Sequence, residues 1–151
     1  MNCKPLLLMI TLIMLLSCGK KNSPKYAVID KSLGTILNKD EINNSHYCVV
    51  IPRAGCGGCI DNASMYVKRN ISKFKNVQVI FTGVVDRKLL HLELGDIVLK
   101  LPNVHIDKAD LFQDLKVKSI YPQVLTLENG ITTDIKELDV ENNNMSAMLQ
   151  Q

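Results

Sequence analysis

Short apolar runs alternate along this chain with longer segments in which apolar residues recur every three or four positions. The run from Tyr47 to Ile51 is apolar throughout, as expected for a central strand that is buried on both faces. Val77 to Thr82 is predicted as the next buried strand. Between the two strands, Ile60 to Phe74 has apolar residues at three- or four-residue spacing, which predicts a helix with one buried stripe. The pattern therefore predicts a strand, a helix and a second strand in succession.

The flanking segments continue this alternation of strands and helices. Gln123 to Leu127 and Ile131 to Lys136 lie on either side of Glu128-Asn129-Gly130, and Asn-Gly between two apolar runs favours a hairpin. The other predicted elements are a strand at Tyr26 to Asp30, a helix from Asp86 to Leu101, a strand at Val104 to Ile106 and a short helix at Lys108 to Leu115. Strands that alternate with helices and end in a hairpin indicate an α/β fold around a mixed sheet.

The N-terminus has the pattern of an export signal. Lys4 precedes an apolar run of 11 residues from Leu6 to Leu16, which is too short to cross a bilayer because that needs about 20 residues. Leu15-Leu16-Ser17-Cys18 follows and resembles the lipobox of bacterial lipoproteins. The resemblance implies a signal peptide at residues 1–17 and a lipid on Cys18. An ordinary secretory signal with a nearby cysteine is the alternative.

A lipoprotein signal would place the domain outside the cytoplasm. Residues 18–25 are predicted as the lipidated cysteine and a polar tether, and residues 26–151 as one domain. We expect an exported, membrane-anchored protein that faces the periplasm or the cell exterior. The net charge of +3, the dispersed lysines and an aromatic content of 5% argue against a nucleic-acid partner, because such sites combine basic grooves with stacking aromatics.

Two cysteines lie where the first apolar strand meets the helix, in the sequence Cys56-Gly57-Gly58-Cys59. A cysteine at a helix N-terminus is close to unpaired N–H groups and to the positive end of the helix dipole, and both favour the thiolate. A second thiol three residues later is close enough to resolve a mixed disulfide. Cys48 lies in the apolar strand and is predicted to be a buried free thiol, with a third redox role as the alternative.

Three features together make this chain resemble the thioredoxin fold, and more closely the TlpA/ResA-like thiol-disulfide oxidoreductases. They are Cys56-Gly57-Gly58-Cys59, Tyr121-Pro122 at the start of a strand, and Leu127-Glu128-Asn129-Gly130-Ile131 after it. The resemblance implies a thioredoxin-like fold, in which a mixed central sheet is flanked by helices and an extra helix–strand unit is inserted between Val77 and Asp107. It also implies that Pro122 is cis and packs against the disulfide, and that Tyr121 helps to form the substrate groove.

The chain departs from this family near the cysteines. Gly55 stands where the family usually has tryptophan, and Val50 stands where thioredoxins have a buried acid. Arg53 precedes Cys56 by three residues, where it either stabilises a thiolate or is a solvated surface charge. Asp61 is interpreted as a residue of the first helical turn. These residues leave the direction of electron flow undetermined.

The sequence favours a thiol-disulfide oxidoreductase that needs no cofactor and acts on protein thiols and disulfides with a redox partner. Cys56 would attack and Cys59 would resolve. One alternative is a binding lipoprotein with a structural disulfide. Another is a metal-binding protein of the thioredoxin fold, in which His46 or Cys48 completes a site with Cys56 and Cys59, and His105 is a distant candidate ligand.

Overall fold

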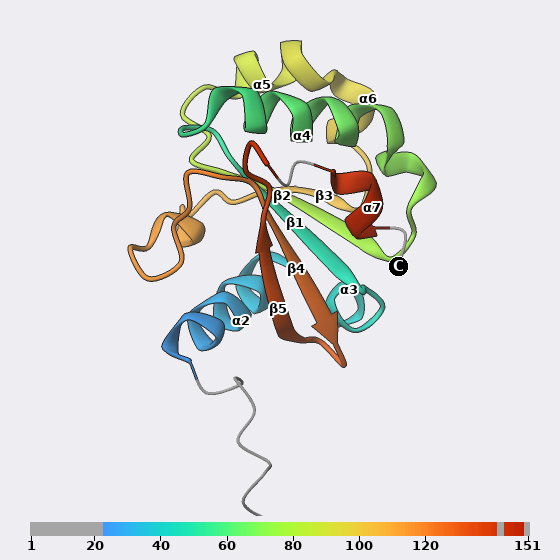
Figure 1. Ribbon diagram of the computed structural model, residues 1–151. Helices are drawn as coiled ribbons and strands as arrows, with labels where there is room; N and C mark the ends of the chain where they lie inside the picture. Colours follow the sequence, from blue (N-terminus) through green and yellow to red (C-terminus); the bar gives the residue numbers. More distant parts are fainter. Residues whose placement is uncertain (1–22, 142–143, 150–151) are drawn as a thin grey trace, which may run out of the picture.

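The computed structural model describes residues 23–141 and 144–149. Its centre is a five-stranded mixed sheet with the strand order β3-β2-β1-β4-β5 (Figure 1). β1 pairs in parallel with β2 and antiparallel to β4, so the sheet changes direction at its middle strand. The strands are β1 (Tyr47–Pro52), β2 (Val77–Thr82), β3 (Val104–Ile106), β4 (Gln123–Glu128) and β5 (Ile131–Glu137).

Helices cover both faces of the sheet. In Figure 1, α4, α5 and α6 lie above the strands and α2 lies below them. The helices are α2 (Pro24–Ile36), α3 (Lys39–Asn43), α4 (Gly57–Asn70), α5 (Arg87–Leu94), α6 (Asp96–Leu99) and α7 (Met145–Leu149), with 3-10 turns η2 (Ile71–Lys73) and η3 (Leu111–Gln113).

Alternate residues of β1 supply the two hydrophobic cores. Val49 and Ile51 face the core formed with α4, α5, α6 and α7. Cys48 and Val50 face the second core, which includes Ile29, Leu33 and Leu37 from α2 and its C-cap. Because successive side chains of a strand point to opposite faces, an apolar run such as β1 can bury both faces. The prediction of a mixed α/β architecture is confirmed.

The segment from Tyr26 to Asp30 is part of helix α2, so the strand predicted there is wrong. Ser23 caps this helix by accepting a hydrogen bond from the Lys25 N–H, and Pro24 occupies the first turn. Both residues are helix-start signals. The helix therefore begins two residues inside the predicted tether.

Two further helix predictions need correction. The segment from Asp86 to Leu101 contains two helices, because Gly95 has a φ of 85° and separates α5 from α6. In place of a helix from Lys108 to Leu115 there is only the 3-10 turn η3. Helix α7 follows the hairpin and was not predicted.

The predicted signal peptide, Cys3 and Cys18 lie outside the described residues. Among the helices that the structure describes, none combines the length and the apolar character needed to cross a bilayer.

Candidate active site

The two cysteines lie where the central strand β1 leads into helix α4. β1 ends at Pro52, and Cys56 is the N-cap residue of α4 with φ −69° and ψ 94°. Cys59 lies in the first turn of the helix. The strand is held from both sides by β2 and β4, so the sheet fixes the point from which the helix starts. The predicted order of strand, loop, cysteines and helix is confirmed.

The two sulfur atoms form a disulfide, with an S–S distance of 2.09 Å and a Cα–Cα distance of 5.3 Å. Cys56 is partly exposed, whereas Cys59 retains 5% of its accessible surface. Because a partner molecule reaches the more exposed sulfur first, this difference suits Cys56 as the attacking residue and Cys59 as the resolving residue.

The first turn of α4 presents backbone N–H groups beside Cys56. The first intrahelical bond runs from the Ile60 N–H to the Cys56 carbonyl oxygen at 2.9 Å. The N–H groups of Gly57, Gly58 and Cys59 therefore precede the helical hydrogen-bond ladder. These groups and the helix dipole favour negative charge at this end of the helix.

Gly55 lets the loop before Cys56 pack directly on the segment before β4. Its φ is 145°, and a Cβ added there would lie 2.2 Å from the Ile120 carbonyl oxygen. That oxygen accepts a hydrogen bond of 2.9 Å from the Cys56 N–H. A tryptophan at this position would meet the Ile120 backbone, which explains physically why this chain has glycine there.

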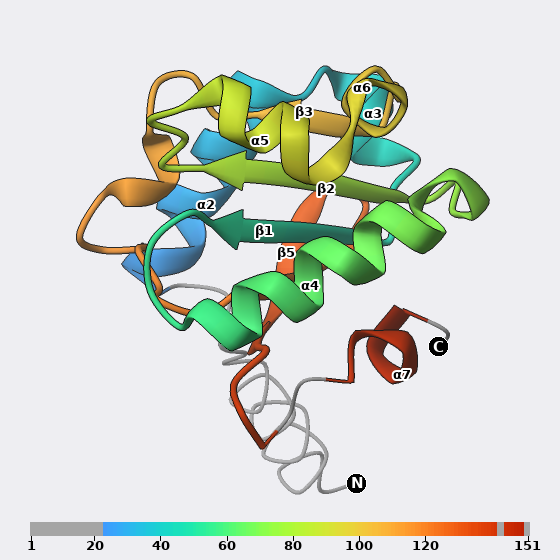
Figure 2. The same ribbon diagram turned by 90° about the horizontal axis from the view of Figure 1, so that it is seen from above.

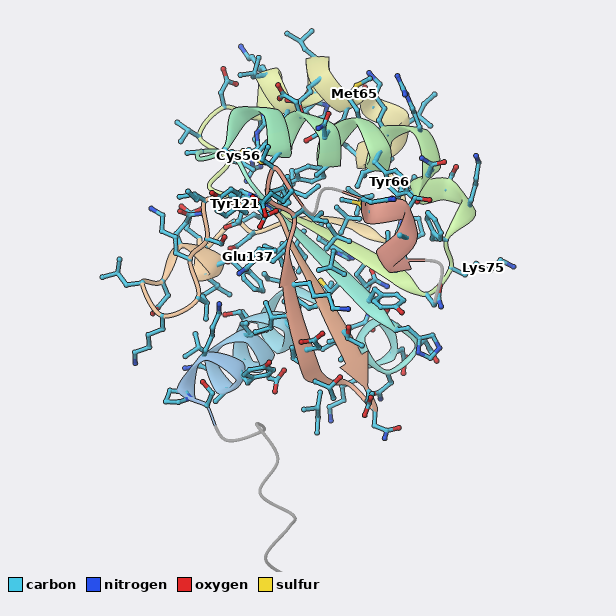
Figure 3. All side chains as sticks on the ribbon, viewed as in Figure 1. Cys56, Met65, Tyr66, Lys75, Tyr121 and Glu137 are labelled. Atoms are coloured by element: carbon cyan, nitrogen blue, oxygen red, sulfur yellow. A yellow bond between two sulfur atoms is a disulfide. The ribbon has the colours of Figure 1, made fainter. Side chains whose placement is uncertain are left out.

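Tyr121 and Pro122 follow Ile120 and lead into β4. In Figure 3 Tyr121 and Cys56 lie at the same end of the sheet, near the start of α4. Tyr121 is half-buried, and its N–H donates to the Ser119 Oγ at 3.0 Å. Pro122 is buried and its carbonyl oxygen accepts from the Leu138 N–H at 2.8 Å. The structure therefore brings this segment to the cysteines through Ile120.

The expected cis proline is wrong, because the described residues contain no cis peptide bond. Pro122 instead precedes the first residue of β4, a position where the missing N–H of proline costs no ladder hydrogen bond.

Arg53 is paired with a carboxylate. Its Nη1 donates to the Glu93 Oε1 at 3.1 Å and its Nη2 donates to Oε2 at 2.7 Å. The side chains are 15% and 28% exposed. The pair ties the loop before Cys56 to α5, and it neutralises the charge that would otherwise act on a thiolate. Asp61 is exposed and is the fifth residue of α4, so its predicted place in the first turn is wrong.

A buried acid lies at the same end of the sheet, in the segment that follows β3. The residues that β1 contributes to the second core are Cys48 and Val50, so β1 provides no carboxylate there. Asp107, just after β3, is 1% exposed. Its Oδ2 accepts from the Thr82 Oγ1 and from the Phe112 N–H, both at 2.9 Å, and its Oδ1 has no hydrogen-bond partner among the described residues.

The other candidate ligands lie away from the disulfide. His46 precedes β1, at the opposite end of that strand from Cys56. Cys48 is fully buried in the α2-side core, and burial raises the pKa of its thiol. His105 is also on the α2 side of the sheet, where its Nε2 lies 2.9 Å from the Gln78 Oε1. Within residues 23–141 and 144–149, no three His, Cys, Asp or Glu side chains gather as a metal site.

Sequence reasoning missed two residues that bond to Cys56 and to the loop before it: Ile120 and Glu93. Ile120 lies two residues before Pro122, and the resemblance had already placed Tyr121 and Pro122 near the cysteines. That was a weak sign that the segment before β4 belongs to the site. The pairing of Arg53 with Glu93 spans 40 positions, and no local pattern indicates it.

Comparison with protein-family models gives no match for this chain. Comparison with curated proteins gives none either.

Proposed function

We propose that the protein is a thiol-disulfide oxidoreductase with a thioredoxin-like fold, anchored outside the cytoplasm by a lipid on Cys18. The single observation that carries the activity is the unequal exposure of two bonded sulfurs at the start of a helix. Cys56 is accessible and Cys59 is 5% exposed. A purely structural bridge would stabilise little through chain entropy, since it closes a loop across a sequence separation of only three.

The topology supports the proposed fold. Three parallel strands and an antiparallel hairpin share one sheet, and the cysteines follow the central strand. The α5–α6–β3 unit corresponds in position to the helix–strand insertion of the TlpA/ResA-like branch. The lipid anchor rests on the Leu15-Leu16-Ser17-Cys18 sequence alone.

In the reducing direction, the Cys56 thiolate attacks one sulfur of a partner disulfide. A Cys56–partner disulfide forms and the other partner sulfur leaves as a thiolate. Cys59 then attacks the Cys56 sulfur as a thiolate, which restores the Cys56–Cys59 disulfide and releases the second partner thiolate. Two electrons pass to the partner, and a reductant of dithiol class must reduce Cys56–Cys59 again. The same steps in reverse oxidise a dithiol.

Each step uses a feature of the site. The N–H groups of Gly57, Gly58 and Cys59 favour the attacking thiolate at the N-terminus of α4. The helical turn keeps Cys59 within bonding distance of Cys56. Burial of Cys59 keeps the partner from bonding to it first.

The test is reduction of insulin by dithiothreitol, with and without the protein. We expect acceleration by the native chain, loss of the acceleration in Cys56→Ser, and little change in Cys48→Ala, which replaces a buried cysteine outside the site. When the Cys59→Ser variant is reduced, freed of dithiothreitol and then mixed with insulin, a mixed disulfide at Cys56 should form and can be isolated, because no second thiol resolves it. Equal acceleration by native chain and Cys56→Ser would refute the proposal.

A further inference from the structure

The loops around Cys56 combine exposed apolar side chains with exposed cations. The four apolar side chains range in exposure from 52% to 100%. Val85 lies between β2 and α5, and Leu89 lies in the first turn of α5. Leu115 and Ile120 lie in the segment before β4. We define the docking surface as the apolar residues Val85, Leu89, Leu115 and Ile120 with the exposed cations Arg87, Lys88, Lys116 and Lys118.

Hydrogen bonds hold these segments at the same edge of the sheet as the disulfide. The Arg53 N–H donates to the Thr82 carbonyl oxygen at 3.1 Å, which links the loop before Cys56 to the end of β2. The Gly83 N–H donates to the Asp110 Oδ1 at 3.2 Å, which links the β2–α5 loop to the segment after β3. The Cys56 N–H donates to the Ile120 carbonyl oxygen at 2.9 Å, which links the start of α4 to the segment before β4. In Figure 2 the end of β2, the start of α4 and the start of α5 lie on one side of the molecule.

Two carboxylates of these segments, those of Asp86 and Asp114, accept hydrogen bonds from nearby backbone N–H groups. Asp86 caps α5, where its Oδ1 accepts from the N–H groups of Lys88 and Leu89 at 2.8 and 3.3 Å. Asp114 Oδ1 accepts from the Lys116 N–H at 2.8 Å. The side-chain cations of the docking surface form no ion pair with any residue that the structure describes. They are therefore available to a partner.

From this arrangement we infer that the partner is a polypeptide whose redox-active cysteine lies in a segment of mixed acidic and apolar residues. The inference rests on the proposed function and names its substrate class. Cations near an active sulfur attract an acidic segment and raise its rate of association. The exposed apolar side chains give the same segment a surface on which to bury its own apolar residues.

Two synthetic peptides test the inference. Each carries one cysteine as a mixed disulfide with 2-thiopyridine, flanked by leucines and by either glutamates or lysines. The reduced protein, in a chain with Cys3→Ser and Cys18→Ser, attacks the peptide sulfur. Neutral 2-thiopyridone is released and absorbs light, and Cys59 then frees the peptide thiol. The neutral control is 2,2′-dithiodipyridine, which releases the same chromophore.

At low ionic strength we expect the acidic peptide to react about 10-fold faster than the basic one. The preference should shrink at about 1 M salt, where screening acts over about 3 Å. Lys116→Glu with Lys118→Glu should remove the preference and leave the rate with dithiodipyridine unchanged. The matched charge control is Lys73→Glu with Lys75→Glu, before β2. Figure 3 shows Lys75 far from Cys56, so this control should keep the preference.

Apolar docking has its own variant pair. Leu115→Ser should slow both peptides, whereas Ile97→Ser on α6, at a residue 83% exposed, should slow neither. Equal rates for the two peptides, together with a fast reaction of dithiodipyridine, would overturn this inference and leave the proposed function standing. A slow reaction with both peptides and dithiodipyridine would overturn both. Loss of binding to anionic phospholipid vesicles in Lys116→Glu with Lys118→Glu, without any peptide preference, would instead assign the surface to lipid.

Discussion

Replacement of Gly55 by alanine should destabilise the fold more than replacement of Gly57, although the two glycines are two residues apart. At Gly55 the backbone has a φ of 145°, and a Cβ would lie 2.2 Å from the Ile120 carbonyl oxygen and 2.7 Å from its Cα. The neighbour is backbone, so the clash cannot be relieved by rotation of a side chain. At Gly57 a Cβ meets nothing within 4 Å, and φ is not positive.

The size of the effect follows from two contributions. An alanine held in a backbone region that strongly favours glycine costs about 1–3 kcal/mol. Displacement of Ile120 also breaks the Cys56 N–H hydrogen bond, which contributes about 1 kcal/mol. Gly55→Ala should therefore lower the free energy of unfolding by about 2–4 kcal/mol. Gly57→Ala should raise it by about 0.4–1 kcal/mol, because alanine restricts the unfolded chain.

Urea unfolding of the oxidised proteins, followed by far-ultraviolet circular dichroism, measures both free energies. Circular dichroism suits this chain because it contains no tryptophan. If Gly55→Ala lay within about 0.5 kcal/mol of the native protein, the close approach of Gly55 to Ile120 would be refuted. The same conclusion would follow if the two variants were equally stable.

Two further predictions concern half-buried His105 and buried Cys48, on the α2 side of the sheet. Burial lowers the pKa of His105 from its ordinary 6.5, so the unfolded chain binds a proton at a higher pH than the folded chain. The free energy of unfolding should therefore fall as pH drops below about 6.5. Urea unfolding at several pH values should show a smaller fall for His105→Gln than for the native chain. An equal fall in the two proteins would contradict the role of His105. Cys48 is fully buried and its thiol pKa is raised, so a thiol reagent should modify it only after unfolding in a reduced chain with Cys3→Ser and Cys18→Ser. Rapid modification of three thiols in the folded chain would be inconsistent with this burial.

The central strands were predictable because their sequence signal matches their environment. β1 and β2 are buried on both faces, and such strands are continuous apolar runs. The hairpin turn was equally clear, since Asn129 and Gly130 both have positive φ and the Asn-Gly pair favours that conformation.

The strand predicted at Tyr26 to Asp30 failed because the window was too short. Those five residues are compatible with a strand, but Ile29 and Leu33 lie on the buried stripe of a longer helix. Ser23 and Pro24 are the helix-start signals that a wider window includes. In the helix predicted from Asp86 to Leu101, the regular apolar spacing continues past Gly95, although the chain breaks there into α5 and α6.

The sequence predicted the two cysteines at their observed place but not the contacts that surround them. Cys56 and Cys59 were found from spacing alone, because strand, loop and helix follow one another locally. The approach of Ile120 to Gly55 and the pairing of Arg53 with Glu93 join segments far apart in the chain. Such contacts depend on how the loops pack, which no local pattern encodes.

The reduction potential of the Cys56–Cys59 pair tests the central claim most directly. It is measured by equilibrating the chain, with Cys3→Ser and Cys18→Ser, in thiol buffers of known potential and trapping the free thiols. An exchange-active pair should give a midpoint between about −270 and −120 mV, the range of proteins that catalyse disulfide exchange. A midpoint below about −300 mV is typical of structural disulfides in secreted proteins and would contradict the assignment.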